Sequence, residues 1–285
     1  MPSPSPITGR GWVKVFKEYY GMVLPPFAKD IPPEAMYESP AMKEVLERIK
    51  YTVENDLFAV LTADPGCGKS TEIRRLKSEL PKDEYVLLYL SDSKLTPRDL
   101  YKGLLNQLGV EGKNNRSEAK HQLQKEIEAI RCIQKKRVVC VLDEAHLLEK
   151  ETIEEFRFLL NCDCDSKNPM ALVLSGQTEL WDEKLRLKRY AAVKQRVDIN
   201  CVLPHLDRAE TESYIRAHLA YSGCGQEIFT AHAIDEIYKT SSGIMRVINK
   251  VCKKALMYGA QQQHRLIDDR DILYVTEHEM IGGGA

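Results

Sequence analysis

The chain has 285 residues, of which 43% are hydrophobic, and a formal net charge of -1. This length and apolar content are enough to bury a sizeable core, and we expect two domains. The near-zero net charge excludes a uniformly basic nucleic-acid coat, so any polyanionic partner must be bound by local clusters of basic residues.

The eight cysteines show no paired zinc spacing, which predicts reduced thiols rather than disulfides or a zinc site. No apolar run approaches the roughly 18 residues of a membrane span, and residues 1–10 lack the apolar region of a signal peptide. We therefore expect a soluble, cytoplasmic protein with no membrane partner.

Residues 1–18 are expected to form a flexible N-terminal segment, because the first eleven are rich in Pro, Ser and Gly. The spacing of Trp12, Val13, Phe16 and Tyr20 predicts a short helix that packs either on the body of the protein or on a partner. Residues 24–33 carry four prolines, which predicts an extended strap leading into a helix at 40–55.

Strands and helices alternate over the next part of the chain. The expected strands cover 57–63, 85–90, 138–142, 170–175 and 198–203, and the expected helices between them cover 69–80, 96–108, 117–136 and 151–161. Such alternation is typical of a parallel sheet with helices on both faces. We therefore expect residues 19–206 to form an α/β domain that binds a nucleotide.

Only helical patterns remain after this region, at 207–222, 230–241, 245–258 and 268–277. Acidic residues stand where the first and last of these helices begin, namely Asp207 with Glu210 and Asp268 with Asp271. Gly259 is the expected stop of the third helix. We expect residues 207–279 to form a small helical lid domain, followed by a disordered tail at 280–285.

The stretch 61–71 has the spacing of a phosphate-binding loop, L-T-A-D-P-G-C-G-K-S-T. Small residues let successive backbone N–H groups converge on phosphates, Lys69 can reach the β and γ oxygens, and the Ser70 hydroxyl can ligate Mg²⁺. The following helix directs its positive end at the same anion. The expected contacts to a nucleoside triphosphate are Asp64, Pro65, Gly66, Cys67, Gly68, Lys69, Ser70 and Thr71.

One position departs from the signature G-x-x-x-x-G-K-[ST], because Ala63 stands where the first glycine would be. Alanine adds only a methyl group at the end of the strand, and we expect it to be tolerated if φ at Ala63 is negative. The alternative for the whole stretch is a glycine-containing turn before a helix, with a chance lysine.

The second motif is the apolar strand 138–142, which ends in Asp143 and Glu144. A run that is apolar on both faces indicates a central strand of a parallel sheet, and ligands bind at the carboxyl ends of such strands. We expect Asp143 to hold the Mg²⁺ shell and Glu144 to orient and polarise the attacking water. The alternative is an acidic cap on the following helix.

Three further residues are candidates for contacting the γ-phosphate. Gln177, or failing it Ser175, lies at the tip of the strand 170–175, with an ordinary polar loop residue as the alternative. Arg196 ends a stretch of six basic residues at 184–196 and is a candidate arginine finger directed at a neighbouring subunit. The alternative for that stretch is a solvated helix face. Arg246 begins the third lid helix and can close over the phosphates of its own subunit.

The segments A-D-P-G-C-G-K-S-T, L-D-E-A-H, S-G-Q-T-E-L, K-Q-R-V and G-I-M-R-V-I-N-K-V-C together resemble AAA+ ATPases of the secretion-pathway protein A type, or ExeA-like family. The likeness covers roughly residues 18–279. It implies a P-loop AAA+ fold, ATP and Mg²⁺ as cofactors, and an ATPase activity that is slow and dependent on assembly. It also implies the roles given above to Lys69, Ser70, Asp143, Glu144, Gln177, Arg196 and Arg246. Gln177 departs from the Asn or Thr of many AAA+ proteins.

The resemblance leaves two main functions open. Many proteins of this shape are similar to the TnsC, TniB and MuB groups, which oligomerise as rings or helical filaments on duplex DNA and activate a transposase. Secretion members instead power an envelope machine and continue into a membrane span and a wall-binding module, neither of which is in this sequence. We expect the transposition role, resting on analogy within the family. A scaffold that barely hydrolyses ATP is the third alternative.

Duplex DNA would be bound without sequence specificity, mainly through its phosphates. The candidate contacts are Lys94, Thr96 and Arg98 after the second strand, and Lys113 and Arg116 in the loop that follows. A third basic tract at 135–137 has the end of a helix as its alternative role. Thr96 stands just before a proline, so helix capping is a rival role that is compatible with DNA contact.

Overall fold

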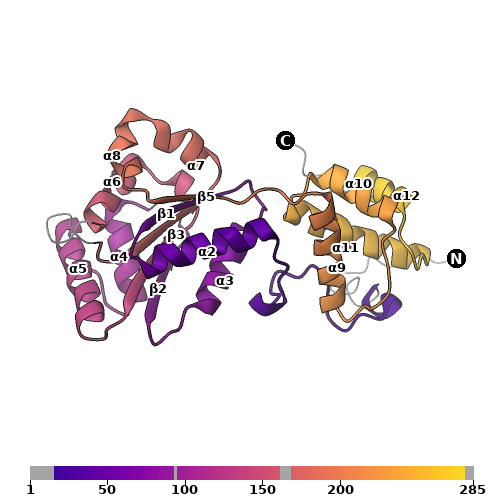
Figure 1. Cartoon of the computed structure of the whole chain (residues 1–285), viewed down its shortest axis with the longest axis horizontal. Coiled ribbons are helices and arrows are strands. Elements are labelled where there is room, and N and C mark those ends of the chain that lie inside the picture. The colour runs from indigo at the N-terminus through magenta and orange to yellow at the C-terminus, as the bar shows by residue number, and fades with distance from the viewer. Residues whose placement is uncertain (1–15, 93–94, 161–167, 280–285) are drawn as a thin grey trace. The chain divides into compact units, whose positions relative to one another are not determined.

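The computed structural model describes residues 16–92, 95–160 and 168–279, and it contains two compact units (Figure 1). One unit is continuous in sequence, from Pro40 to Pro204. The other joins the residues before Pro40 to those from His205 onward.

The continuous unit is built on a sheet of five parallel strands. They are β1 (Phe58–Thr62), β2 (Tyr85–Leu90), β3 (Arg137–Leu142), β4 (Ala171–Gly176) and β5 (Ile199–Val202), in the order β2-β3-β4-β1-β5. The predicted α/β fold with a parallel sheet is therefore confirmed. β4 lies between β1 and β3 and is parallel to both, so the carboxyl ends of these three strands lie side by side.

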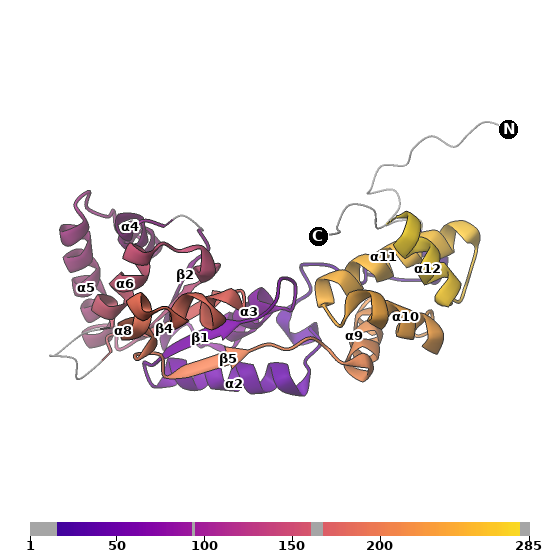
Figure 2. The same ribbon diagram turned by 90° about the horizontal axis from the view of Figure 1, so that it is seen from above.

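Helices cover both faces of this sheet. They are α2 (Pro40–Glu54), α3 (Lys69–Glu79), α4 (Pro97–Gln107), α5 (Arg116–Cys132) and α6 (Lys150–Leu159), with the short α7 (Glu179–Asp182) and α8 (Ala191–Lys194). Figures 1 and 2 show α2 and α3 on one face and α4, α5 and α6 on the other. The central strands are apolar on both sides because both faces are covered.

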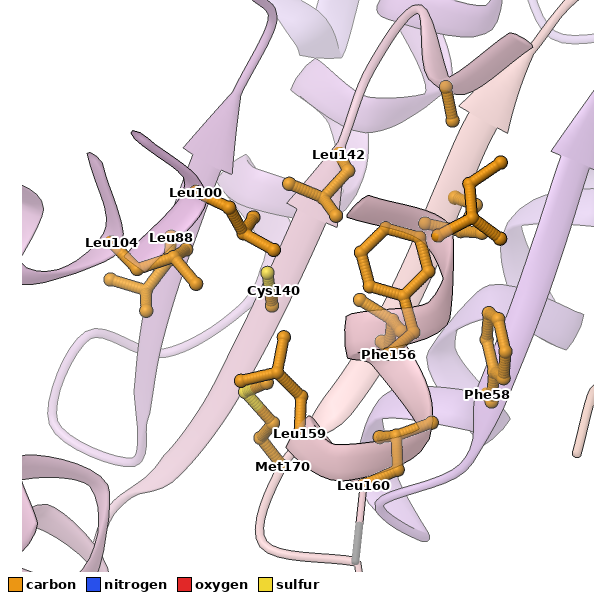
Figure 3. Packing of buried hydrophobic residues seen from close by; sticks show 14 of the residues in the cluster. Phe58, Leu88, Leu100, Leu104, Cys140, Leu142, Phe156, Leu159, Leu160 and Met170 are labelled. Atoms are coloured by element: carbon orange, nitrogen blue, oxygen red, sulfur yellow. The ribbon is translucent and has the colours of Figure 1, made fainter. Parts of the chain in front are cut away.

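A hydrophobic core lies between the sheet and α4, α5 and α6. Alternate strand residues such as Phe58 and Cys140 point into it, and Phe156 of α6 packs among them (Figure 3). All three side chains are at most 1% exposed. Burying one large apolar side chain stabilises the fold by about 1.5–3 kcal/mol, so this cluster holds the strand ends in fixed positions.

Two predicted segments of this unit differ from the structure. The helix expected to reach residue 136 ends at Cys132, because Lys135 adopts a positive φ of 56° and the Lys136 N–H donates to the carbonyl of Ile130. The basic stretch 184–196 is not one solvated helix. It is divided into short turns because Leu185, Tyr190 and Val193 are buried.

The second unit contains α9 (Arg208–Tyr221), α10 (Ala231–Ser241), α11 (Met245–Gln262) and α12 (Asp269–His278). The predicted helical C-terminal region is therefore present. Capping boxes start α9 and α12 at Asp207 and Asp268, where the acidic residues predicted helix starts.

Residues 16–39 belong to this unit and pack on α9 and α11. Phe16, Tyr20 and Phe27 are buried, and the Tyr20 hydroxyl donates to the carbonyl of His264 at 2.9 Å. This packing differs from the expected grouping of 19–39 with the α/β domain, because aromatic side chains anchor the segment to the helices. The short helix expected around Phe16 packs on the body of the protein, although Trp12 and Val13 lie outside the described residues. The expected tail at 280–285 lies outside them as well.

Gly259 does not stop its helix, contrary to the prediction. α11 continues to Gln262, and the next residue, Gln263, has the positive φ that ends it. Gly259 is needed for a different reason. A Cβ at this position would lie 2.4 Å from the Tyr20 hydroxyl oxygen, so the glycine makes room for the N-terminal segment.

Within the part of the chain that is described, no helix is both long and apolar enough to cross a lipid bilayer.

Candidate nucleotide-binding site

The phosphate loop connects β1 to α3 and has the backbone that its glycines allow. Gly66 and Gly68 both have φ of 95°, in the left-handed region where glycine is favoured. Ala63 is not among the described non-glycine residues with positive φ, and its N–H donates to the carbonyl of Gly176 at 3.3 Å. The methyl group of Ala63 is therefore compatible with the loop, as expected.

Lys69 begins α3 and folds back over the loop. Its ammonium donates to the carbonyl of Ala63 at 2.8 Å and lies 3.5 Å from the carbonyl of Asp64. The side chain is buried, so its charge is held within the curve of the loop rather than in solvent. A cation at this position, together with the N-terminus of α3, favours an anion in the loop.

Asp143 is the point at which four elements meet. Its two carboxylate oxygens accept hydrogen bonds from the Ser175 hydroxyl at 2.7 Å and the Tyr89 hydroxyl at 2.8 Å. The N–H of Glu144 donates to the same carboxylate at 3.0 Å, and the Ser70 hydroxyl lies 3.5 Å from it. The predicted metal ligands Ser70 and Asp143 are thus brought together from α3 and β3.

The spacing of these two oxygen atoms fits a hard cation. Mg²⁺ takes oxygen ligands at about 2.0–2.1 Å, so two ligands of one ion lie no more than about 4 Å apart. The separation of 3.5 Å between Ser70 Oγ and Asp143 Oδ2 satisfies this limit. A hydroxyl and a carboxylate are also the type of donor set that Mg²⁺ prefers over soft metals.

Glu144 differs from Asp143 in conformation and exposure. It adopts a left-handed backbone with φ of 54°, and its side chain is 46% exposed, whereas Asp143 is 5% exposed. An uncommon backbone conformation at a non-glycine residue is maintained only where the surrounding structure supports it. The carboxylate of Glu144 is therefore placed where it can contact water, as its predicted role requires.

His146 stands beside Glu144 and was not singled out from the sequence, although it belongs to the L-D-E-A-H motif. Its Nδ1 lies 3.5 Å from the Glu144 carboxylate and accepts the N–H of Gln177 at 3.4 Å. Burial lowers the pKa of His146, so the imidazole is neutral at pH 7. Local spacing could have indicated His146, because it lies two residues after the acidic pair.

The tip of β4 contacts the site through more than one residue. Ser175, the second choice from the sequence, bonds directly to Asp143, whereas Gln177 contacts His146 through its backbone. The Thr178 hydroxyl, which sequence reasoning missed, donates to Asp64 of the phosphate loop at 3.3 Å. β4 therefore links the phosphate loop to the acidic strand, as its place between β1 and β3 requires.

Comparisons with known proteins agree with this geometry. Residues 52–182 match the protein family described as AAA domain. Among solved structures, Cdc6p from Pyrobaculum aerophilum has a TM-score of 0.68, with 15% identity, and the likeness covers 91% of this chain and 71% of that one. The Holliday junction branch migration motor RuvB of Thermotoga maritima has a TM-score of 0.52, with 17% identity, over 82% of this chain and 68% of that one.

The chain has the P-loop AAA+ fold. Drosophila ORC bound to DNA is similar as well, with a TM-score of 0.64 and 16% identity over 99% of this chain and 69% of that one. At these identities the likeness concerns the fold alone.

One curated protein is similar to this chain in sequence. General secretion pathway protein A of Aeromonas hydrophila is 30% identical over 256 residues, which are 89% of this chain and 46% of that protein. The chain thus spans less than half the length of this relative.

Arg196 lies near the amino ends of the strands, whereas the phosphate loop lies at their carboxyl ends. It stands two residues before Asp198, whose N–H donates to the carbonyl of Phe58 at the beginning of β1. The loop follows the other end of β1, and five strand residues span roughly 16 Å. The structure therefore does not bring Arg196 to Lys69 within one AAA+ domain.

Arg246 lies in the other unit. It is an exposed residue in the first turn of α11. Its predicted role at the phosphates stays a prediction.

The candidate DNA contacts fall into different environments. Arg98 and Lys102 of α4 both donate to the Asn114 side chain, at 3.1 and 2.7 Å, which places the start of α4 beside the loop that carries Lys113. We call Arg98, Lys102 and Lys113 the α4 basic cluster. Lys102 was not singled out from the sequence.

The remaining candidates have other contacts or no description. Thr96 caps α4 by accepting the N–H of Asp99 at 3.2 Å. Arg116 forms an ion pair with the buried carboxylate of Glu155, while 57% of the Arg116 side chain is exposed. Lys94 lies outside the described residues.

Proposed function

We propose that the protein is an ATP-hydrolysing switch that oligomerises on duplex DNA and serves as a target-selection and activation helper of a transposase. The observation that carries the ATPase part is the meeting of Ser70, Tyr89 and Ser175 at Asp143, beside a phosphate loop that already holds Lys69. These groups form a site for a triphosphate and its cation at the carboxyl ends of β1, β3 and β4.

The chemistry assigned to the site is hydrolysis of the γ-phosphate. Lys69 and the loop N–H groups bind and orient the phosphates, and Glu144 holds and polarises the attacking water. Mg²⁺ bound by Ser70 and Asp143 would neutralise charge on the phosphate oxygens. Because Asp143 is buried and hydrogen bonded, its orientation is set before the substrate arrives.

The location of Arg196 supports the proposed self-association. Since it lies across the sheet from its own phosphate loop, the nucleotide it can reach as an arginine finger is that of a neighbouring protomer. Arg246 would contact the phosphates of its own protomer. ATP and subunit contact then stabilise each other, and hydrolysis weakens the interface. Turnover thereby acts as a timer for disassembly.

The DNA partner is supported by the α4 basic cluster. Arg98 and Lys102 at Asn114, with the adjacent Lys113, can contact backbone phosphates without reading bases. An assembly repeats this small patch along the duplex, and the combined binding is tight and sensitive to salt. The similar fold of Drosophila ORC was determined with that protein bound to DNA, which is in line with this proposal.

A second function is favoured by one observation. The 30% identity to General secretion pathway protein A supports an ExeA-like ATPase of a secretion or cell-envelope machine. The same ATPase chemistry would serve that function, and the two proposals differ in the macromolecule that the assembly binds.

Sedimentation with plasmid DNA at two salt concentrations, with ATP, ADP or no nucleotide, separates the two proposals. ATP-dependent pelleting that falls steeply with salt supports the DNA-bound switch. If Mg²⁺-ATP binds but DNA never pellets, the secretion-type function is favoured. If the protein does not bind Mg²⁺-ATP, both proposals fail.

The client is tested by crosslinking the ATP-bound protein in cells and identifying what is captured. Recovery of a transposase supports the helper role, whereas recovery of envelope proteins contradicts it.

A further inference from the structure

We infer that Tyr89 is a positioning residue for the carboxylate of Asp143, and that Gln107 ties Tyr89 to α4 and thereby to the basic cluster. This inference rests on the proposed function, because it assumes that Asp143 holds the cation of a bound nucleotide. It concerns two residues to which sequence reasoning assigned no role.

The first part of the argument is the contact at the carboxylate. The Tyr89 hydroxyl donates to Asp143 Oδ2 at 2.8 Å, and the Ser70 hydroxyl lies 3.5 Å from the same oxygen. Ser175 donates to the other oxygen, Oδ1, at 2.7 Å. Because Tyr89 holds Oδ2 while Ser175 and the N–H of Glu144 hold Oδ1, rotation of the carboxylate about its Cβ–Cγ bond is restricted. Tyr89 therefore sets the direction in which Oδ2 faces Ser70.

The Tyr89 hydroxyl acts on Asp143 as a hydrogen-bond donor, at 2.8 Å from Oδ2. A phenol that donates to the carboxylate orients it and does not compete with it for the cation. This contact suits a positioning group rather than a metal ligand.

The second part of the argument is the backbone of Tyr89. Among the described residues β2 is an edge strand, so no described strand pairs with the outward N–H and C=O of Tyr89. The Gln107 side chain replaces that strand. Its Oε1 accepts the Tyr89 N–H at 2.8 Å, and its Nε2 donates to the Tyr89 carbonyl. The Gln107 side chain thus satisfies both the N–H and the C=O of Tyr89. It thereby fixes the backbone from which the Tyr89 side chain extends.

The third part is α4 itself. The helix has 11 residues, or about 16 Å, with Arg98 in its first turn and Gln107 as its last residue. It lies close on β2, because a Cβ on Gly103 would be 3.0 Å from the Leu90 side chain. Leu100 and Leu104 are fully buried beneath it. A displacement of α4 by phosphates at the basic cluster would therefore move Tyr89 and reorient Asp143.

Tyr89→Phe removes only the hydroxyl and tests the first contact. The affinity for a fluorescent ATP analogue is measured in EDTA and across a Mg²⁺ titration, with Tyr85→Phe on the same strand as the control. We expect the Mg²⁺ concentration for half-maximal binding to rise about tenfold, since a hydrogen bond to a charged group is lost. The affinity for the ATP analogue in EDTA and the melting temperature should stay at wild-type values. A merely structural role of Tyr89 would lower both.

Gln107→Ala tests the connection to α4, with Asn106→Ala as the matched exposed control. We expect the Mg²⁺ concentration for half-maximal binding to rise about threefold, which is a smaller change than in Tyr89→Phe. Duplex DNA should change the Mg²⁺ dependence of the wild type but not of Gln107→Ala. Because the Gln107 side chain is exposed, this variant carries the test even if Tyr89→Phe folds poorly.

Each outcome has a distinct meaning. Wild-type Mg²⁺ dependence in folded Tyr89→Phe, or in Gln107→Ala, overturns the inference and leaves the proposed ATPase in place. Absence of Mg²⁺-dependent nucleotide binding in the wild type overturns the proposed function itself. An equal response of the wild type and Gln107→Ala to DNA overturns the connection to the basic cluster.

Discussion

Two adjacent carboxylates at the end of β3 have opposite environments. Asp143 is 5% exposed and accepts hydrogen bonds from Ser175 and Tyr89, while the Glu144 side chain is 46% exposed. A buried, oriented carboxylate suits a fixed cation, and an accessible one suits a moving water molecule. The difference arises because Asp143 continues the strand whereas Glu144 turns into the left-handed region.

Glu144→Gln should keep nucleotide binding but lower the hydrolysis rate by about 10²–10⁴-fold, since an amide is a poor general base. Under the timer proposal the ATP-bound assemblies should then persist on DNA. Phosphate release and sedimentation in ATP measure the two effects. Glu149→Gln, an exposed neighbour, is the control, and normal DNA release by Glu144→Gln would contradict the timer.

Gly259→Ala should lower the free energy of unfolding by about 1–3 kcal/mol, because its Cβ would lie 2.4 Å from the Tyr20 hydroxyl oxygen. Urea denaturation measures the change. Gly225→Ala is the control, since no atom lies within 4 Å of its added Cβ. Adding Tyr20→Phe to Gly259→Ala should recover part of the loss, and a double variant no more stable than the single one would contradict this explanation.

At the scale of elements, the two ends of α4 have different contacts. Its first turn is capped by Thr96 and carries Arg98, while its last residue pairs with the edge of β2. The cap and the DNA contact proposed for Thr96 are distinguishable, because aspartate also caps helices but repels phosphate.

Thr96→Ala should destabilise the protein by about 1 kcal/mol through loss of the cap. Thr96→Asp should keep the stability of the wild type and weaken DNA pelleting, with the stronger effect at low salt. Thermal unfolding and sedimentation provide the two readouts. If Thr96→Asp pellets with DNA as the wild type does, Thr96 has no DNA contact.

The helical unit contains a buried histidine that links its stability to pH. His218 stacks on Phe27 and meets the edge of Tyr214, and burial lowers its pKa to about 4. The unfolded chain has the ordinary value of about 6.5, so it binds a proton that the folded unit excludes. The stabilisation is thus complete above pH 6.5 and is lost as the pH falls toward 4.

The free energy of unfolding of the helical unit should therefore fall by about 3 kcal/mol between pH 7 and pH 4. Urea denaturation at several pH values measures it. His218→Phe should flatten this part of the pH dependence, whereas His232→Gln, at an exposed position, should not. An unchanged pH dependence in His218→Phe would show that other groups dominate.

At the scale of the whole molecule, the parallel sheet separates the two ends of the proposed active site. The phosphate loop follows the carboxyl end of β1, and Arg196 lies level with its amino end. If Arg196 is the proposed finger, a complete site needs a second protomer, and activity should depend on assembly.

Arg196→Ala should abolish hydrolysis while keeping the nucleotide affinity of the monomer. Mixing it with Glu144→Gln should restore part of the ATPase activity, because Glu144→Gln supplies the finger and Arg196→Ala supplies the Glu144 carboxylate at a shared interface. Phosphate release by the mixture, compared with each variant alone, is the measurement. Equal loss of affinity and hydrolysis in Arg196→Ala would contradict the finger.

Local sequence spacing was sufficient to predict much of the fold of this protein. The loop at 61–71, the apolar strand before Asp143 and the acidic helix starts depend on neighbours within a few residues, and they predicted the parallel sheet and the helical region correctly. Backbone conformation at such positions is dictated by residue type and by short-range hydrogen bonds.

Contacts between distant segments were decided by the tertiary structure. Tyr89 reaches Asp143 across 54 residues, Arg116 is engaged by a buried carboxylate, and Gly259 makes room for a tyrosine 239 residues earlier. No local pattern encodes such pairings, because they depend on strand order and on which helix covers which face. The chain's own spacing thus determined which chemistry is present, and packing decided which side chains hold it in place.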